Sequence, residues 1–203
     1  MNRSSAMPVP PYEPMGVMDA IYQRRSVRDY TPELVSQASI HMLLYAAVQA
    51  PTAMHEEPWA FVVIQDRNLL DRLSETAKRT IWLQAQNEDE RGLARNAMNM
   101  VSDPAYNVFY NARTLIVIYG KPLGPFVTAD CWLAAENLML AACTAGLGTC
   151  VIGLAVPALN SPEWKQMLEI PEEMTAYTPI LLGYPASAPP PSTRNPPKMI
   201  CWK

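Results

Sequence analysis

Apolar residues along the chain fall into segments whose lengths and spacing distinguish helices from buried strands. Short apolar runs rich in β-branched residues predict strands at 59–64, 114–119, 149–152 and 177–182. Helical spacing and capping residues predict helices at 17–23, 31–50, from residue 67 onward, 128–145 and 161–168. Helices and strands interleave without a repeating βαβ unit, so the pattern predicts one domain of mixed α and β structure.

The predicted helix at 31–50 has sequence signals at both ends. Thr31 is suited to the N-cap, Pro32 to the first helical position and Glu33 to the first turn. Pro51 lacks the N–H that a further helical turn would need, so the helix is expected to end at Ala50.

The predicted helix at 128–145 is almost uncharged. Its ionisable residues are Asp130 and Glu136, and alanine and leucine dominate the rest. A helix that is apolar on most faces must be buried on most faces. We therefore expect it at the centre of the fold or of a dimer interface, with Gly146 ending it as a C-cap glycine.

Composition narrows the class of protein. The chain has 203 residues, 49% of them hydrophobic and 17% charged, which favours a globular core over disorder. A net charge of −3 provides no basic field, so nucleic acids and anionic membranes are not expected partners. No apolar run approaches the roughly 18 residues of a membrane span, and the N-terminus lacks a signal peptide. We expect a cytoplasmic protein that acts on small molecules.

The cysteines and histidines do not form a metal-binding pattern. There is no CxxC pair and only two histidines are available, so no zinc-ligand spacing can be assembled and no metal is expected. Reduced thiols that fill the core or an interface are the preferred interpretation. The residues concerned are Cys131, Cys143, Cys150, Cys201, His41 and His55.

Proline is concentrated near the two ends of the chain. Half of the 20 prolines lie in the segments Pro8–Pro14 and Pro185–Pro197, which cannot be helix or central strand. We expect an extended or disordered N-terminal arm at 1–14, then a single domain over 15–203 that includes a C-terminal arm at 184–203. Met199, Ile200 and Trp202 would anchor the C-terminal arm on a surface.

Motifs for hydrolase, metal and dinucleotide chemistry are absent. The glycine cluster at 146, 148 and 153 follows a predicted helix and opens a predicted strand, whereas a Rossmann loop follows a strand and opens a helix. GxxxxGK[ST], GxSxG, HExxH and a supported carboxylate pair are also missing. No side chain is therefore predicted as a catalytic acid, base or nucleophile.

A cationic turn follows the first predicted helix. Arg24, Arg25 and Arg28 surround Ser26, and guanidinium groups bind phosphate oxygens through paired hydrogen bonds. The turn is suited to a phosphate monoester. Alternatively, its cations simply complement the C-terminal end of the helix.

Several segments in order resemble one family. Residues 24–28 (RRSVR), 50–59 (APTAMHEEPW), 146–153 (GLGTCVIG), 183–185 (GYP) and Arg194 together resemble the nitroreductase family of FMN flavoproteins over roughly 15–198. The resemblance implies an α+β fold in which helices flank a central mixed or antiparallel sheet. It further implies a homodimer with an exchanged C-terminal arm and two identical FMN sites at the subunit interface.

The resemblance also assigns residues to the cofactor. Arg24, Arg28 and Arg194, assisted by Ser26, would hold the FMN phosphate. The loop at 51–53 would pack on the flavin ring from the partner chain, and the turn at 152–153 would face flavin N5 and O4. The expected cofactor-binding residues are Arg24, Arg25, Ser26, Arg28, Pro51, Thr52, Ala53, Met54, His55, Ile152, Gly153 and Arg194.

Two residues depart from the family pattern. His55 stands where asparagine is usual and Glu57 where glutamine is usual. A neutral imidazole has one donor nitrogen and one acceptor nitrogen on opposite sides of its ring, so toward one partner it can replace either the donor or the acceptor of an amide side chain. A carboxylate near the flavin would disfavour an anionic reduced flavin. His55 either contacts the flavin or makes an ordinary hydrogen bond in a loop.

The expected function is NAD(P)H-dependent reduction of nitroaromatics, quinones or similar electron-poor acceptors by a ping-pong mechanism, with FMN supplying the hydride chemistry. Two alternatives remain open: a flavin enzyme with a dedicated reaction, such as enone reduction or substrate dehydrogenation, and a flavin-binding protein with little turnover. Residues 84–103 form either a surface excursion with helical character or a lid over the substrate pocket. Trp82, Met98 and Met100 line that pocket or belong to the core.

Overall fold

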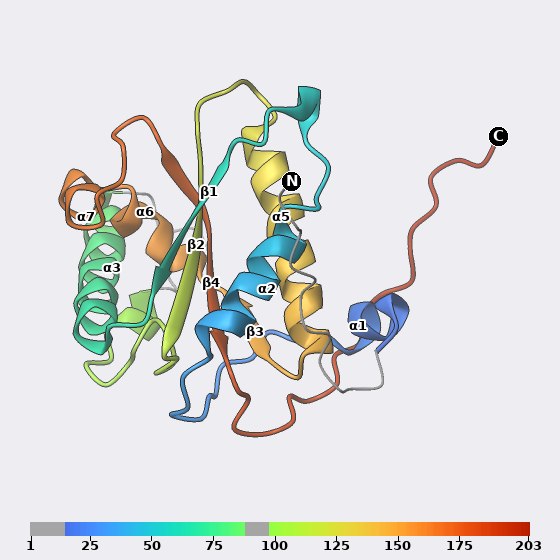
Figure 1. The fold of residues 1–203 in the computed structure, drawn as a ribbon. Helices are drawn as coiled ribbons and strands as arrows, with labels where there is room; N and C mark the ends of the chain where they lie inside the picture. The colour runs from blue at the N-terminus through green and yellow to red at the C-terminus, as the bar shows by residue number, and fades with distance from the viewer. Residues whose placement is uncertain (1–14, 88–97) are drawn as a thin grey trace, which may run out of the picture.

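The protein is a three-layer α+β structure, described here from a computed structural model for residues 15–87 and 98–203 (Figure 1). Its sheet has the order β1-β2-β4-β3, and every neighbouring pair is antiparallel. The strands are β1 (Trp59–Ile64), β2 (Thr114–Gly120), β3 (Gly148–Val151) and β4 (Thr175–Gly183). All four predicted strands are thus confirmed, and of the two expected sheet types the antiparallel one is found.

Helices cover both faces of the sheet. On one face lie α2 (Gln37–Ala47) and α5 (Val127–Thr144); on the other lie α3 (Arg67–Asn87), α6 (Val156–Leu159) and α7 (Pro162–Met167). Short 3₁₀ turns, η1 (Ala53–His55) and η2 (Gly153–Ala155), precede β1 and α6. Helix α1 (Val17–Gln23) packs against α5 at the side of the body.

Strand β2 explains why the sheet needs cover on both sides. All seven of its residues are buried. Leu115 and Val117 belong to the core beneath α3 and α6, while Ile116 and Ile118 belong to the core beneath α2 and α5. Because side chains alternate across a strand, one apolar run supplies both cores.

The predicted start of the second helix is wrong. Helix α2 begins at Gln37, and its N-cap is Ser36, whose hydroxyl accepts a hydrogen bond from the Ser39 N–H at 3.1 Å. The Thr31 N–H instead donates to the Tyr184 carbonyl at 2.9 Å. The backbone at 30–31 is held by the end of β4, so the chain stays extended past Pro32 despite the capping residues there.

Helix α5 ends as predicted. Gly146 has φ +71°, and its N–H donates to the Cys143 carbonyl while the Leu147 N–H donates to the Ala142 carbonyl. This pair of bonds is a Schellman motif, which requires the left-handed conformation that glycine adopts without strain. The glycine cluster therefore ends a helix and opens β3, as its order in the sequence indicates.

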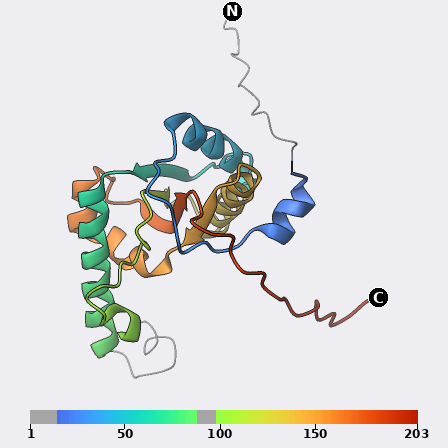
Figure 2. The same ribbon diagram turned by 90° about the horizontal axis from the view of Figure 1, so that it is seen from below.

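The C-terminal arm leaves the body. Figure 2 shows it extending away from the sheet on the same side as α1. Met199, Ile200 and Trp202 are exposed, Ile200 by 92%, so they do not anchor the arm on their own chain. The arm is extended, as predicted, but among the described residues no surface of the same chain covers these three side chains.

The expected N-terminal arm at 1–14 lies wholly outside the described residues. The segment at 84–103, expected as a surface excursion or lid, lies outside them in its middle part, at 88–97. Cys131 and Cys150 are free and buried, as predicted for thiols that fill the core, whereas Cys201 is exposed. Within the described ranges, no helix is long and apolar enough to cross a membrane.

Candidate functional site

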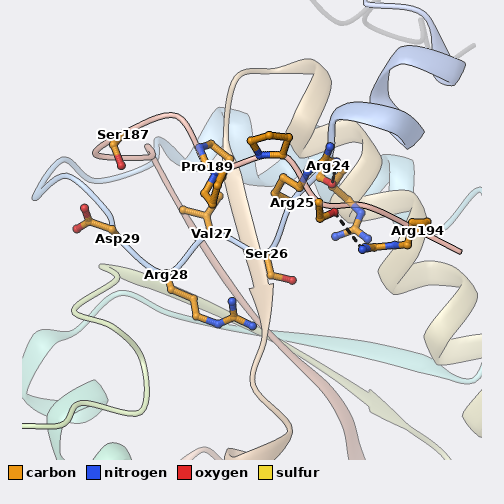
Figure 3. A pocket seen from close by; sticks show the side chains of 12 residues that line it. Arg24, Arg25, Ser26, Val27, Arg28, Asp29, Ser187, Pro189 and Arg194 are labelled. Carbon is orange, nitrogen blue, oxygen red and sulfur yellow. Dashed lines mark hydrogen bonds between the residues drawn. The ribbon is translucent and has the colours of Figure 1, made fainter.

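Two segments from opposite ends of the chain enclose a basic pocket (Figure 3). Residues 24–29 form one wall, and residues of the stretch 187–194 form the other around a volume of about 470 Å³. Arg194 lies beside Arg24 and Arg25 in this view, whereas Arg28 lies apart from them. The structure therefore brings Arg194 beside Arg24 and Arg25, from which it is 169 or more residues away in the sequence.

The sheet holds the first wall in place. The Val27 N–H donates to the Thr149 carbonyl of β3 at 2.9 Å, and Ser26 forms an isolated parallel bridge with Thr149. The Ala186 N–H donates to the Asp29 carbonyl at 3.0 Å. Segment 24–29 thus runs along β3 and continues beside the chain that leaves β4.

Two glycines let this wall approach the sheet. A Cβ on Gly148 would lie 2.7 Å from Val27 Cγ2, and a Cβ on Gly183 would lie 2.8 Å from Tyr30 Cδ1. Both distances are shorter than real Cβ contacts. A side chain at either position would push the arginine-bearing segment away from β3 or β4.

The arginines of the pocket differ in their partners. Arg25 donates to the Tyr22 carbonyl at 2.7 Å and to the Arg24 carbonyl at 2.8 Å, so it caps the C-terminal end of α1. Arg24 Nε lies 3.5 Å from Glu136 Oε1 on α5. The helix-capping alternative thus holds for Arg25, while Arg24 retains its two terminal nitrogens for a ligand.

Arg28 and Arg194 are the arginines most available for an anion. Among the described residues, no carboxylate lies within 4.0 Å of either guanidinium group. Arg194 donates within the arm to Ser192 Oγ at 3.0 Å. Asp29 is the one carboxylate that lines the pocket, against four guanidinium groups, so the hollow is strongly cationic and suited to an oxyanion.

A second group of predicted residues lies at the other end of α5. The loop at 51–57 forms the turn above the N-terminal end of α5 in Figure 1. Met54, His55 and Glu57 have positive φ values of 56°, 58° and 44°. Such values are uncommon for residues other than glycine and concentrate at functional sites.

The remaining predicted residues follow β3. Ile152 is buried and its N–H donates to the Pro179 carbonyl at 2.9 Å, while Gly153 is exposed and opens η2. Neither lines the basic pocket, and neither does the loop at 51–57. Within one chain the predicted cofactor residues therefore form three separate groups.

Several residues at these positions were not predicted. In the sequence, Glu136 and Asp130 stand out only as the two ionisable residues of an apolar helix. In the structure, Glu136 pairs with Arg24, and Asp130 accepts a hydrogen bond from the Ala53 N–H at 3.2 Å. Pro189 and its neighbours line the pocket. Each contact joins segments that are 77 residues or more apart, and a single sequence offers no signal for them.

Comparison with known proteins agrees with this geometry. A model of the nitroreductase family matches residues 21–184. The chain belongs to the nitroreductase family. The match ends before Arg194, so the place of that residue in this nitroreductase-family chain rests on the pocket geometry alone.

The relatives of this nitroreductase-family chain have different names. It is 32% identical over 165 residues to an Archaeoglobus fulgidus protein named NADH dehydrogenase/NAD(P)H nitroreductase, covering 81% of this chain and 83% of that protein. It is 24% identical over 181 residues to an iodotyrosine deiodinase of Thermotoga neapolitana, covering 87% and 92%. A Bacteroides fragilis nitroreductase with bound FMN superposes with a TM-score of 0.77 at 26% identity, covering 92% and 97%.

Proposed function

We propose that this protein is an FMN-dependent oxidoreductase that uses NAD(P)H. The observation on which the proposal rests is the basic pocket, which Arg28 and Arg194 both line without carboxylate partners among the described residues. Family membership and the FMN in the Bacteroides fragilis structure agree with it.

The residues of the pocket fit a terminal phosphate. Arg24, Arg28 and Arg194 would supply guanidinium donors, and Ser26 would add a hydroxyl. Pro189, Pro190 and Pro191 line the side formed by the arm, where their fixed φ keeps the backbone extended. Arg25 would contribute charge rather than direct donors, because it is engaged at the end of α1.

When bound, FMN supplies hydride chemistry that needs no acid, base or nucleophile from the protein. The chain's own residues bind and orient it. We propose that the loop at 51–57 and the turn at 152–153 act at the ring end of the cofactor, with the loop coming from the partner subunit. This arrangement requires a homodimer, because the loop and the basic pocket lie at opposite ends of α5 within one chain.

Uncovered apolar surface supports that homodimer. Met18 and Ile21 on α1 are exposed, as are Trp132 and Leu133 on α5. The arm adds the exposed Met199, Ile200 and Trp202 on the same side of the molecule. Large apolar side chains exposed on three elements favour a protein interface over a solvated surface.

The test of the cofactor is the absorbance of the purified protein. We expect flavin bands at about one FMN per chain, because each chain supplies one phosphate pocket. FAD is expected to bind poorly, since its phosphates are not terminal. A colourless protein that takes up no FMN on titration would contradict the proposal.

Nitroaromatics and quinones are the proposed acceptors. One site that serves donor and acceptor in turn gives ping-pong kinetics, with parallel double-reciprocal lines as either substrate is varied. Intersecting lines would require two binding positions and would overturn this mechanism.

A dedicated reductive reaction is the second candidate. The Thermotoga neapolitana deiodinase matches 87% of this chain, so the acceptor panel should include 3-iodo-L-tyrosine beside a nitroaromatic, a quinone and an enone. A kcat/KM for one of these compounds that exceeds the others by at least about a hundredfold would favour a dedicated enzyme over a broad reductase.

A flavin-binding protein with little turnover is the third candidate, motivated by His55 and Glu57. Replacing Glu57 with glutamine removes a carboxylate from the proposed flavin loop and should speed flavin reduction. The neighbouring Glu56→Gln removes the same charge outside the pattern and is the control. Negligible NADH and NADPH consumption with every acceptor, before and after these changes, would favour the binding protein.

A further inference from the structure

The buried carboxylate of Asp130 is hydrogen-bonded to the loop at 51–57. Neither Asp130 nor this loop lines the phosphate pocket, so phosphate binding does not account for the contact. Asp130 lies in the first turn of α5 and is only 4% exposed. Its Oδ1 accepts a hydrogen bond from the Ala53 N–H at 3.2 Å across 77 residues of sequence. In the described part of the chain, this bond is the one that ties residues 52–57 to another element.

The loop itself has an unfavourable backbone. Met54, His55 and Glu57 all have positive φ, and the Met54 side chain is 86% exposed, so packing of that side chain does not hold the conformation. Residues in such conformations persist only where surrounding contacts determine them. The contact available here is the Asp130–Ala53 hydrogen bond at the start of η1.

The position of Asp130 makes it a firm anchor. Helix α5 packs against the sheet and α2, and the neighbouring Cys131 and Ala134 are fully buried. The N-terminal end of a helix also favours a negative charge, because backbone N–H groups point toward it. An acceptor fixed on this helix can hold the loop in one conformation.

We propose that Asp130 is a positioning residue: through the Ala53 N–H it holds the loop at 51–57 in the conformation that meets the partner's flavin. The inference rests on the proposed function, because it takes this loop to act at the ring end of FMN. Asp130 touches neither cofactor nor substrate. Its effect is therefore on the rate of flavin reduction, while the phosphate pocket at the far end of α5 keeps its affinity.

The first experiment uses the FMN-free protein and amide hydrogen exchange of residues 52–57. Asp130→Ala should raise the exchange of the Ala53 amide at least about tenfold, as expected for losing a hydrogen bond to a charged acceptor. Asp130→Asn keeps an oxygen acceptor and should restore most of the protection. Asp66→Ala removes a carboxylate that caps α3 through the Leu69 N–H at 2.9 Å, and it should leave the loop unchanged.

The second experiment uses the FMN-loaded protein. Asp130→Ala should slow flavin reduction by NAD(P)H at least about tenfold while FMN affinity changes less than about threefold, and Asp130→Asn should recover most of the rate. If Asp130→Ala does not fold, Ala53→Pro removes the donor from the loop side and leaves the core intact.

The two experiments distinguish failure of the positioning role of Asp130 from failure of the proposed FMN-dependent function. Unchanged exchange of residues 54–57 in both Asp130→Ala and Ala53→Pro would overturn the positioning role, as would equal reduction rates in Asp130→Ala and wild type. A wild-type chain that binds no FMN would end the proposed function, whereas the exchange experiment would still report on Asp130.

Discussion

Arginines close together in this sequence have different surroundings in the structure. Arg25 is engaged with backbone carbonyls at the end of α1, whereas Arg28 has no carboxylate within 4.0 Å among the described residues. Because Nη1 of Arg25 already donates to two carbonyls, this guanidinium group has fewer donors left for an anion than one without such partners. The contribution of each arginine to cofactor binding therefore depends on its partners more than on its position in the motif.

Replacing Arg194 with alanine should weaken FMN binding. The loss of one charge-assisted contact costs about 1.5 to 3 kcal/mol, or about 10- to 150-fold in Kd. A fluorescence titration with FMN measures the change. Lys198→Ala removes the same charge from the same arm outside the pocket and should alter Kd less than about threefold; equal effects of the two variants would remove Arg194 from the site.

Replacing Gly148 with alanine should displace the arginine-bearing segment. The new methyl group would meet Val27 at 2.7 Å, and overpacking of this kind costs about 1–3 kcal/mol. Thermal unfolding should show a lower melting temperature, together with weaker FMN binding. Gly153→Ala places its methyl group in open space, so its melting temperature should stay that of the wild type.

At the scale of elements, local patterns predicted most of the fold. The four strands were found from their apolar, β-branched runs and helix α5 from its lack of charge. Burial on both faces explains the continuous pattern of β2, whereas β1 at the edge of the sheet has a similar run but is mostly half-buried. The start of α2 was missed because Thr31, Pro32 and Glu33 have the chemistry of a helix start, yet the Thr31 N–H is bound by Tyr184. A pairing across 153 residues overrode a local preference.

The candidate site was predicted only in part. The basic turn and Arg194 were found and do meet, whereas the roles of Glu136 and Asp130 depend on contacts between distant segments. The arm was expected to be extended because prolines exclude helix and central strand. The exposure of Met199, Ile200 and Trp202 within their own chain could not be predicted. Apolar residues indicate that a segment is buried, but they do not indicate whether it packs on its own chain or on another one.

Removal of the arm from Pro189 onward should do more than the Arg194 substitution. It deletes one wall of the basic pocket together with Met199, Ile200 and Trp202, which are exposed here and are proposed to pack on a partner subunit. FMN retention on gel filtration and the melting temperature of the FMN-free protein should both fall. A truncated chain with unchanged FMN affinity and melting temperature would show that the arm is a dispensable tail.

At the scale of the whole molecule, apolar surface is distributed unevenly. Exposed apolar residues occur on α1, α5 and the arm, and Figure 2 shows the arm leaving the body on the side of α1. The loop at 51–57 and the basic pocket lie at the two ends of α5. A two-fold dimer across this side would place the loop of one chain against the pocket region of the other. One flavin site would then need two chains.

A charge placed in this surface should separate the subunits. Trp132→Glu on α5 is expected to shift the mass measured by light scattering from dimer toward monomer and to release FMN, because an unpaired charge is costly to bury. Gln166→Glu adds the same charge on α7 at the opposite face of the sheet and should leave both properties unchanged. A dimer of unaltered stability in the Trp132 variant would place the interface elsewhere.

The strand order has a consequence for synthesis on the ribosome. Strand β4 lies between β2 and β3, yet it is the last strand of the chain to be made. Until it emerges, β2 keeps an unpaired apolar edge and β3 has no partner, so both are open to pairing with other chains. The nascent protein therefore passes through an interval in which most of it is translated and the sheet cannot close. We expect this interval, rather than the stability of the finished fold, to limit the soluble yield when the protein is produced rapidly.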